Sequence, residues 1–146
     1  MRILMVCHGN ICRSPLAEFL LRDMAERAGR GGDFEIASAA VSDEEIGNPI
    51  YPPVKRILRE KGIACEQKRA RRITKHDYDY YDRIIGMDER NRAGLLRFFG
   101  GDPAGKISLL LPGREVADPW YTGDFERALR DITEGCERIL TETKQE

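Results

Sequence analysis

The chain has 146 residues, of which 41% are hydrophobic and 34% charged, a balance that is typical of a globular protein and excludes a disordered or fibrous one. Its 24 basic and 25 acidic residues give a formal net charge of −1, which argues against a nucleic-acid-binding protein, because such proteins neutralise phosphates with a basic excess. No apolar run approaches the ~20 residues of a membrane-spanning helix, and the N-terminal apolar run is too short for a signal peptide. We therefore expect a cytoplasmic protein with neither a nucleic acid nor a membrane as partner.

One basic run and four cysteines leave this expectation unchanged. The run KRARRITK, residues 68–75, is more typical of a solvated surface stretch than of a binding patch. The cysteines lack regular spacing, and a chain of this length folds without cross-links, so reduced thiols are expected. They are Cys7, Cys12, Cys65 and Cys136.

The first half of the chain alternates short apolar runs with helical patterns. Residues 2–6 (RILMV) predict a buried strand. Ser14 and Pro15 are typical of a helix N-cap and a first helical position, and apolar spacing carries this helix to Gly29. A second strand, a loop and a short helix are predicted next, at residues 34–40, 41–52 and 53–61.

The second half repeats the alternation. Strand, helix, strand and helix are predicted in turn at residues 83–87, 89–99, 106–111 and 124–142. Asp88 is suited to cap the first of these helices, and Gly100 to end it. Strands that alternate with helices predict an α/β fold with a parallel sheet and helices on both faces, here as a single domain over residues 1–146.

The segment VCHGNICRSP, residues 6–15, leaves the carboxyl end of the first strand, where ligands bind in such folds. A tight loop that runs into a helix directs backbone N–H groups and the positive end of the helix dipole at one point. Gly9 and Asn10 tolerate the positive φ that such a turn needs. Arg13 can grip an oxyanion with two hydrogen bonds, so the segment predicts a site for a dianion such as phosphate.

The same positive field favours the thiolate form of Cys7. A thiolate beneath a bound phosphate is a nucleophile directed at phosphorus, which predicts a phosphocysteine intermediate. Ser14 can hydrogen-bond the thiolate and help Cys7 to leave in the second step.

Three alternatives compete for this loop. A lone cysteine at a strand end is often a buried structural residue, but the C-x5-R-[ST] spacing between strand and helix favours catalysis. Metal binding by Cys7, His8 and Cys12 lacks a fourth ligand nearby, so no metal site is predicted. A nucleotide P-loop would need GxxxxGK[ST], which the sequence lacks.

The loop CHGNICRSP resembles that of the low-molecular-weight protein tyrosine phosphatases, whose pattern is C-x-G-N-I-C-R-S-P. The resemblance continues in order through ASAA, EIGNP, RARRIT, GMDERN, ISLL and DPWY, and so covers essentially the whole chain. It implies a four-stranded parallel sheet and hydrolysis of phosphotyrosine in a protein substrate without metal or other cofactor. It also implies a phosphate-binding loop that includes His8, Gly9, Asn10, Ile11, Cys12 and Ser14. A chain of this size is expected to be a monomer or a weak dimer.

The resemblance assigns the remaining catalytic role to Asp118, in the segment DPWY that lies 111 residues after Cys7. An aspartate in a cleft beside aromatic rings can hold a proton through desolvation, and so serve as general acid and then as base. Trp120 and Tyr121 are expected to wall the cleft and stack on the substrate ring, although Tyr121 could also pack in the core.

Supporting residues and departures follow from the same resemblance. Asn10 and Ser38 are expected to hold the loop in shape, and Asp88 and Asn91 to support nearby backbone or cap a helix. The family often has an aromatic residue after the second strand and a histidine before the RARR segment. This chain has Glu44 or Glu45 and Lys68 at those places, His8 where an apolar residue is common, and Tyr51 as a packing residue.

Rival functions remain open. Protein arginine phosphatases on this scaffold typically have Thr where this chain has Ile11, and the apolar side chain favours an aryl substrate. Arsenate reductase chemistry needs two further cysteines near the third strand, and RIIGMDERN has none. A non-catalytic phosphoprotein-binding module would not need both Cys7 and Asp118. Cys12 could trap oxidised Cys7 as a disulfide, which would make inactivation by peroxide reversible.

Overall fold

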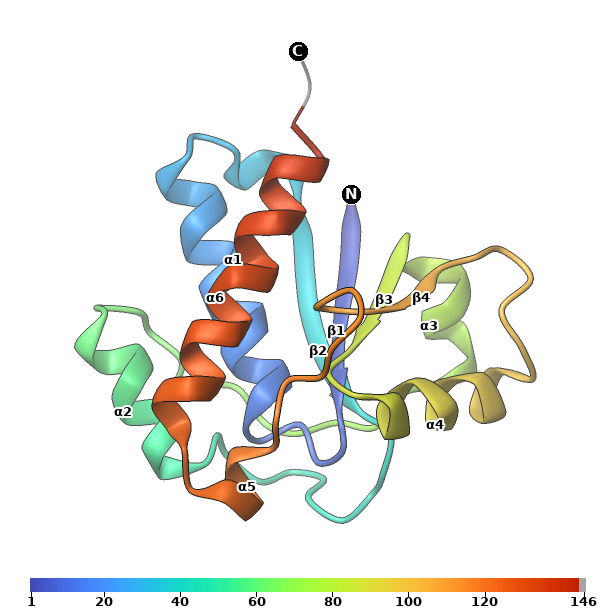
Figure 1. Cartoon of the computed structure of the whole chain (residues 1–146), viewed down its shortest axis with the longest axis horizontal. Coiled ribbons are helices and arrows are strands. Elements are labelled where there is room, and N and C mark those ends of the chain that lie inside the picture. Colours follow the sequence, from blue (N-terminus) through green and yellow to red (C-terminus); the bar gives the residue numbers. More distant parts are fainter. Residues whose placement is uncertain (145–146) are drawn as a thin grey trace.

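The computed structural model describes residues 1–144. Four parallel strands form one sheet in the order β2-β1-β3-β4, which confirms the predicted α/β fold and its parallel sheet (Figure 1). Their bounds are Arg2–Cys7 for β1, Glu35–Ala40 for β2, Arg83–Gly86 for β3 and Ile107–Leu109 for β4.

Helices cover both faces of the sheet (Figure 1). One face carries α1, α2 and α6, and the other carries α3 and α4, while the short α5 lies near the carboxyl ends of the strands. Their bounds are Arg13–Arg27 for α1, Pro52–Glu60 for α2, Lys75–Tyr80 for α3, Glu89–Phe99 for α4, Pro119–Thr122 for α5 and Phe125–Glu142 for α6, with a short 3₁₀ helix at Gly31–Asp33.

The apolar run of β1 is buried on both sides because the strand is central. Its side chains alternate: Ile3 and Met5 join the core beneath α1 and α6, while Leu4 and Val6 join the core beneath α3 and α4. This two-sided burial fixes the register of β1, and with it the position at which Cys7 leaves the sheet.

The start of α1 differs from the prediction. The helix begins at Arg13 with Cys12 at the N-cap position, so Ser14 is not the cap. The physical reason is that the Ser14 hydroxyl is bonded to Cys7 and Asn10 instead. Two short helices, α3 and α5, were not predicted, because each lies in polar or turn-forming sequence. A capping box between Thr74 and Asp77 starts α3.

The last helix follows the prediction closely. Asp124 caps α6 by accepting from the Arg127 N–H at 3.0 Å. An apolar stripe along the helix packs in or against the core, formed by Phe125, Leu129, Ile132, Cys136, Ile139 and Leu140. Cys136 lies on this stripe, fully buried, and burial raises its pKa to about 12. Within residues 1–144, no helix is long and apolar enough to cross a membrane.

Candidate active site

The loop between β1 and α1 is held in an uncommon backbone shape by Asn10. Its φ is 60°, the one positive value at a non-glycine position in the described part of the chain. The amide of Asn10 donates to Ser14 Oγ at 2.8 Å and to Ser38 Oγ at 2.9 Å, and its oxygen accepts from the Arg71 N–H at 3.1 Å. The predicted pairing of Asn10 with Ser38 is therefore present.

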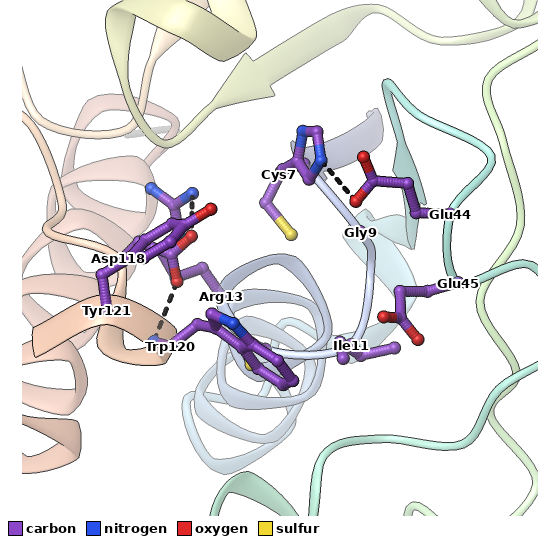
Figure 2. Close-up of a pocket in the computed structure, with 11 residues that line it drawn as sticks. Cys7, Gly9, Ile11, Arg13, Glu44, Glu45, Asp118, Trp120 and Tyr121 are labelled. Carbon is purple, nitrogen blue, oxygen red and sulfur yellow. Dashed lines mark hydrogen bonds and ion pairs between the residues drawn. The ribbon is translucent and has the colours of Figure 1, made fainter. Parts of the chain in front are cut away.

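Cys7 ends β1 at the N-terminus of α1. Its Sγ lies 3.0 Å from Ser14 Oγ and accepts from the Ser14 N–H at 3.4 Å. Figure 2 shows the sulfur directed into the hollow between the surrounding side chains. The Ser14 hydroxyl, the Ser14 N–H and the N-terminus of α1 thus all face this sulfur.

Arg13 is almost completely buried and links three segments. Its Nη1 donates to Asp88 Oδ2 and to the Val116 carbonyl, both at 2.8 Å, and its Nη2 donates to Asp118 Oδ2 at 3.3 Å. Burial lowers the pKa of Arg13, but the negative charges of Cys7 and Asp118 more than offset this, so the pKa is raised overall. Its buried Nε has no hydrogen-bond partner among residues 1–144 and is therefore available to an oxyanion.

Asp118 reaches the site from the loop after β4. Its Oδ1 accepts from the Trp120 N–H at 3.0 Å and so caps α5, while its Oδ2 receives Arg13. Trp120 is half exposed, with its ring centroid 4.8 Å from that of Tyr51. Tyr121 is 77% exposed, so it is not a core residue.

These side chains surround one cavity of about 120 Å³ (Figure 2). Asp118, Trp120 and Tyr121 stand on one side of it, and Glu44 and Glu45 on the other. The full lining is Cys7, His8, Gly9, Ile11, Cys12, Arg13, Glu44, Glu45, Asp118, Trp120 and Tyr121. The structure thus brings together the predicted nucleophile, anion-binding arginine and acid, although they come from distant parts of the sequence.

The wall formed by the two glutamates is more polar than an aromatic wall. Glu44 Oε2 lies 2.9 Å from His8 Nε2, and Glu45 accepts from the Asn48 amide at 2.5 Å. His8 and Glu44, two positions that depart from the family pattern, therefore interact with each other. Tyr51 lies behind Trp120 on the opposite side, where it packs as expected against Trp120 and Phe125.

A buried network supports the loop from beneath, and it includes Glu18, which sequence reasoning missed. Ser38 Oγ donates to Glu18 Oε1 at 2.5 Å, and Lys68 Nζ donates to the Ser38 carbonyl at 3.0 Å. Lys68 lies 3.9 Å from Glu18, and burial lowers its pKa although Glu18 partly opposes this. Lys68 thus takes part in the network. The sequence feature that could have identified Glu18 is an acidic residue inside the apolar run PLAEFLL.

The residues proposed as alternatives or supports have clear positions. Asp88 both caps α4, by accepting from the Asn91 N–H at 2.8 Å, and binds Arg13. Cys12 is a buried free thiol beside Cys7, and its pKa is raised by burial and by the charge of Cys7, while its redox role stays a prediction. In the part of the chain that the structure describes, no group of three His, Cys, Asp or Glu side chains is arranged to hold a metal ion.

Comparison with known proteins gives a consistent result. The family model described as low molecular weight phosphotyrosine protein phosphatase matches residues 2–146. The low molecular weight protein-tyrosine-phosphatase YfkJ of Bacillus subtilis is 39% identical over 99% of this chain and 96% of its own length.

Solved structures agree in shape over the whole fold. The crystal structure of YfkJ superposes with a TM-score of 0.92 at 36% identity, covering 99% of this chain and 97% of that one. The crystal structure of DARP, a Drosophila arginine phosphatase, superposes with a TM-score of 0.90 at 29% identity, covering 100% of this chain and 99% of that one. On the family match and the relative at 39% identity, this chain belongs to the low-molecular-weight phosphotyrosine protein phosphatase family.

Proposed function

We propose that this protein hydrolyses phosphotyrosine in phosphoproteins, with Cys7 as nucleophile, Arg13 as phosphate-binding residue and Asp118 as general acid and base. Residues 1–146 are proposed to act as one phosphatase domain, in agreement with the family match over residues 2–146. The observation that carries the proposal is the convergence of the Cys7 thiol, the partnerless Arg13 Nε and the Asp118 carboxyl on one cavity.

In the first step the phosphate binds in the loop formed by residues 7–14. Backbone N–H groups and Arg13 hold its oxygens, and the Cys7 thiolate attacks phosphorus. The S–P bond forms while the bond from phosphorus to the phenolic oxygen breaks. Protonated Asp118 gives its proton to that oxygen, so tyrosine leaves as a neutral phenol.

In the second step water attacks the phosphocysteine. The Asp118 carboxylate takes a proton from the water, the new P–O bond forms, and the S–P bond breaks. The Ser14 hydroxyl, 3.0 Å from Cys7 Sγ, donates to the departing thiolate. Inorganic phosphate is released, and Asp118 is again protonated for the next cycle.

The substrate ring is proposed to lie between Trp120 and Ile11. Trp120 is half exposed and supported from behind by Tyr51, so its face can stack on a phenyl ring. Ile11 contributes an apolar surface to the same cavity. Both features fit an aryl phosphate.

Protein arginine phosphatase is a second candidate that one observation favours. Glu45 lines the cavity, with its Cγ close to Gly9, and a carboxylate there could pair with the guanidinium of phosphoarginine. The similarity to the Drosophila arginine phosphatase adds to this. Ile11 argues the other way, because it offers no hydrogen bond.

Phosphate release from a phosphotyrosine peptide and a phosphoarginine peptide, measured side by side in excess EDTA, tests the proposal. We expect release from phosphotyrosine at least tenfold faster, and none with Cys7→Ser, as loss of a covalent nucleophile removes the phosphocysteine route. Faster release from phosphoarginine would overturn the substrate assignment but keep the role of Cys7. No release from either would favour the binding-module alternative. An Ile11→Thr variant serves as the control that measures how this side chain divides the two substrates.

A further inference from the structure

A second hollow, of about 740 Å³, adjoins the candidate active site. The two hollows share five residues on their common rim: His8, Arg13, Glu44, Asp118 and Tyr121. The part away from Cys7 is lined by Arg72, Arg90 and Arg97, and we call this part the basic groove. Arg72 comes from the basic run at residues 68–75, whose function the catalytic proposal does not use.

The shape of the basic groove follows from one face of α4. Arg90, Arg97 and the two residues midway between them recur at three- and four-residue spacing, so they share this face. The midway residues are Ala93 and Gly94, whose small size leaves the groove hollow between the two arginines. Arg90 and Arg97 are seven residues apart, which is about 10 Å along the helix.

The charges in the basic groove are unbalanced. Among residues 1–144, no carboxylate lies within 4.0 Å of Arg72, Arg90 or Arg97. By contrast Arg92, on another face of α4, pairs with Glu89 at 3.4 Å. Arg72 instead lies over the Phe98 ring, with its guanidinium carbon 5.7 Å from the centroid.

The acidic residues around this second hollow each have a basic neighbour. Asp88 and Asp118 both bind Arg13, and Glu44 binds His8. They cluster at the catalytic end, so the excess positive charge lies at the end formed by α4. A ligand that reaches from the cavity into the basic groove therefore meets free cationic hydrogen-bond donors.

We propose that the basic groove binds anionic side chains, carboxylate or phosphate, that flank the phosphotyrosine in the substrate. This proposal rests on the proposed function, because the phosphotyrosine anchors the peptide in the adjoining cavity. An extended peptide rises about 3.4 Å per residue, so about three residues span the distance from Arg90 to Arg97. Glu45 lines the cavity but not the second hollow, so its carboxylate would repel such residues on that side, which favours one direction of the peptide.

Matched phosphotyrosine peptides test this proposal. One set carries three glutamates on the N-terminal flank or on the C-terminal flank, and the other carries glutamines at the same positions. For the wild-type protein in low salt we expect kcat/KM to be about three- to tenfold higher for the glutamate peptide on one flank, as two or three exposed ion pairs give. The preference should shrink in 0.5 M salt because of screening.

The double variant Arg90→Gln/Arg97→Gln should lose this preference while its turnover of p-nitrophenyl phosphate, which does not reach the groove, is unchanged. Arg92→Gln, on another face of the same helix, is the matched control and should keep the preference. Equal kcat/KM values of the wild-type protein for glutamate and glutamine peptides would overturn the proposal. So would a preference for the glutamate peptide that survives in the double variant. Peptides with phosphoserine at the glutamate positions then identify which anion binds better.

A separate readout distinguishes failure of the groove from failure of the proposed function. If the wild-type protein releases no phosphate from any peptide, hydrolysis of phosphotyrosine is wrong. Calorimetric binding of the same peptides to Cys7→Ser, with and without the two arginine substitutions, then decides the groove by itself. Equal affinity for glutamate and glutamine peptides would reject it, and a preference that disappears with Arg90 and Arg97 would support it.

Discussion

Arg13 couples the parts of the site that are most distant in sequence. Its guanidinium binds the carboxylate of Asp88 at the start of α4, a backbone carbonyl before α5 and the carboxyl of Asp118. A planar donor group with several N–H bonds in fixed directions suits this task, whereas a lysine ammonium could not serve all three partners and a substrate phosphate together. One buried side chain thus sets the distance between the proposed phosphate-binding loop and the proposed acid.

At Asp118 we expect substitution by Asn to reduce turnover according to the leaving group. Loss of the proton donor should lower kcat/KM, which reports the steps through formation of the phosphocysteine, about 10²- to 10⁴-fold for phenyl phosphate, a poor leaving group. The loss should be much smaller for p-nitrophenyl phosphate, whose phenolate leaves without a proton. Asn keeps the cap of α5, and Asp124→Asn, at the cap of α6, is the matched control. An equal loss of kcat/KM for both substrates would contradict the role of Asp118 as general acid.

At the scale of single elements, α4 was predictable to the residue because its end signals are local. Asp88 caps it and Gly100, with φ at 73°, ends it in the left-handed region. The start of α1 was predicted wrongly because the Ser14 hydroxyl is bonded to Cys7 and Asn10 in the preceding loop. Helices α3 and α5 were missed because they are short and lie in polar or turn-forming sequence. Strand ends likewise depend on pairing with neighbours, so β4 is shorter than the apolar run that predicts it.

The candidate site divides in the same way. The nucleophile loop and the segment DPWY are contiguous motifs, so Cys7, Arg13 and Asp118 were predictable. Glu18 and the orientation of Lys68 were not, because their contact depends on two segments that are fifty residues apart. Pairing of His8 with Glu44 depends in turn on the path of the loop after β2.

Two helix glycines should respond in opposite ways to alanine. A Cβ at Gly135 in α6 would overlap the Leu110 side chain, so Gly135→Ala should lower the free energy of unfolding by about 1–3 kcal/mol. A Cβ at Gly94 in α4 would sit 3.6 Å from Val41, an ordinary contact, so Gly94→Ala should raise it by about 0.5–1 kcal/mol. Urea titration measures both values. Stabilisation by Gly135→Ala would show that α6 does not approach Leu110 this closely.

At the scale of the whole molecule, the sheet order places β1 between β2 and β3, so the candidate site lies where two cores meet. The larger core fixes α1 and α6, and the smaller one fixes α4. Cys7 belongs to the first, while Asp88 precedes α4 over the second. Loosening either core therefore moves one side of the site relative to the other.

Buried thiols should make this fold sensitive to alkaline pH. The Cys136 thiol ionises near its ordinary pKa in the unfolded chain, but in the folded protein burial raises its pKa to about 12. The contribution of this thiol to the free energy of unfolding is complete below pH 8.5. It is lost as the pH rises, because only the unfolded chain releases the thiol proton. The free energy of unfolding should fall by about 1.4 kcal/mol per pH unit from this group. Urea titrations between pH 8.5 and 10.5 measure how steeply the free energy of unfolding falls with pH. This slope should be smaller by the stated amount in Cys136→Ala than in the wild-type protein, and an equal slope would contradict the role of the Cys136 thiol.

The central position of β1 has a consequence for how activity returns after denaturation. β1 pairs with both β2 and β3, so the start of the proposed phosphate-binding loop is fixed only when these two strands have formed. Asp118 is fixed separately, when α5 and the segment before it dock on the sheet. On the proposed roles, a refolding chain would first release p-nitrophenolate from p-nitrophenyl phosphate, which needs no proton from Asp118, and only later release phenol from phenyl phosphate. The ratio of the two rates during refolding then reports when the segment that carries Asp118 docks, without any added dye.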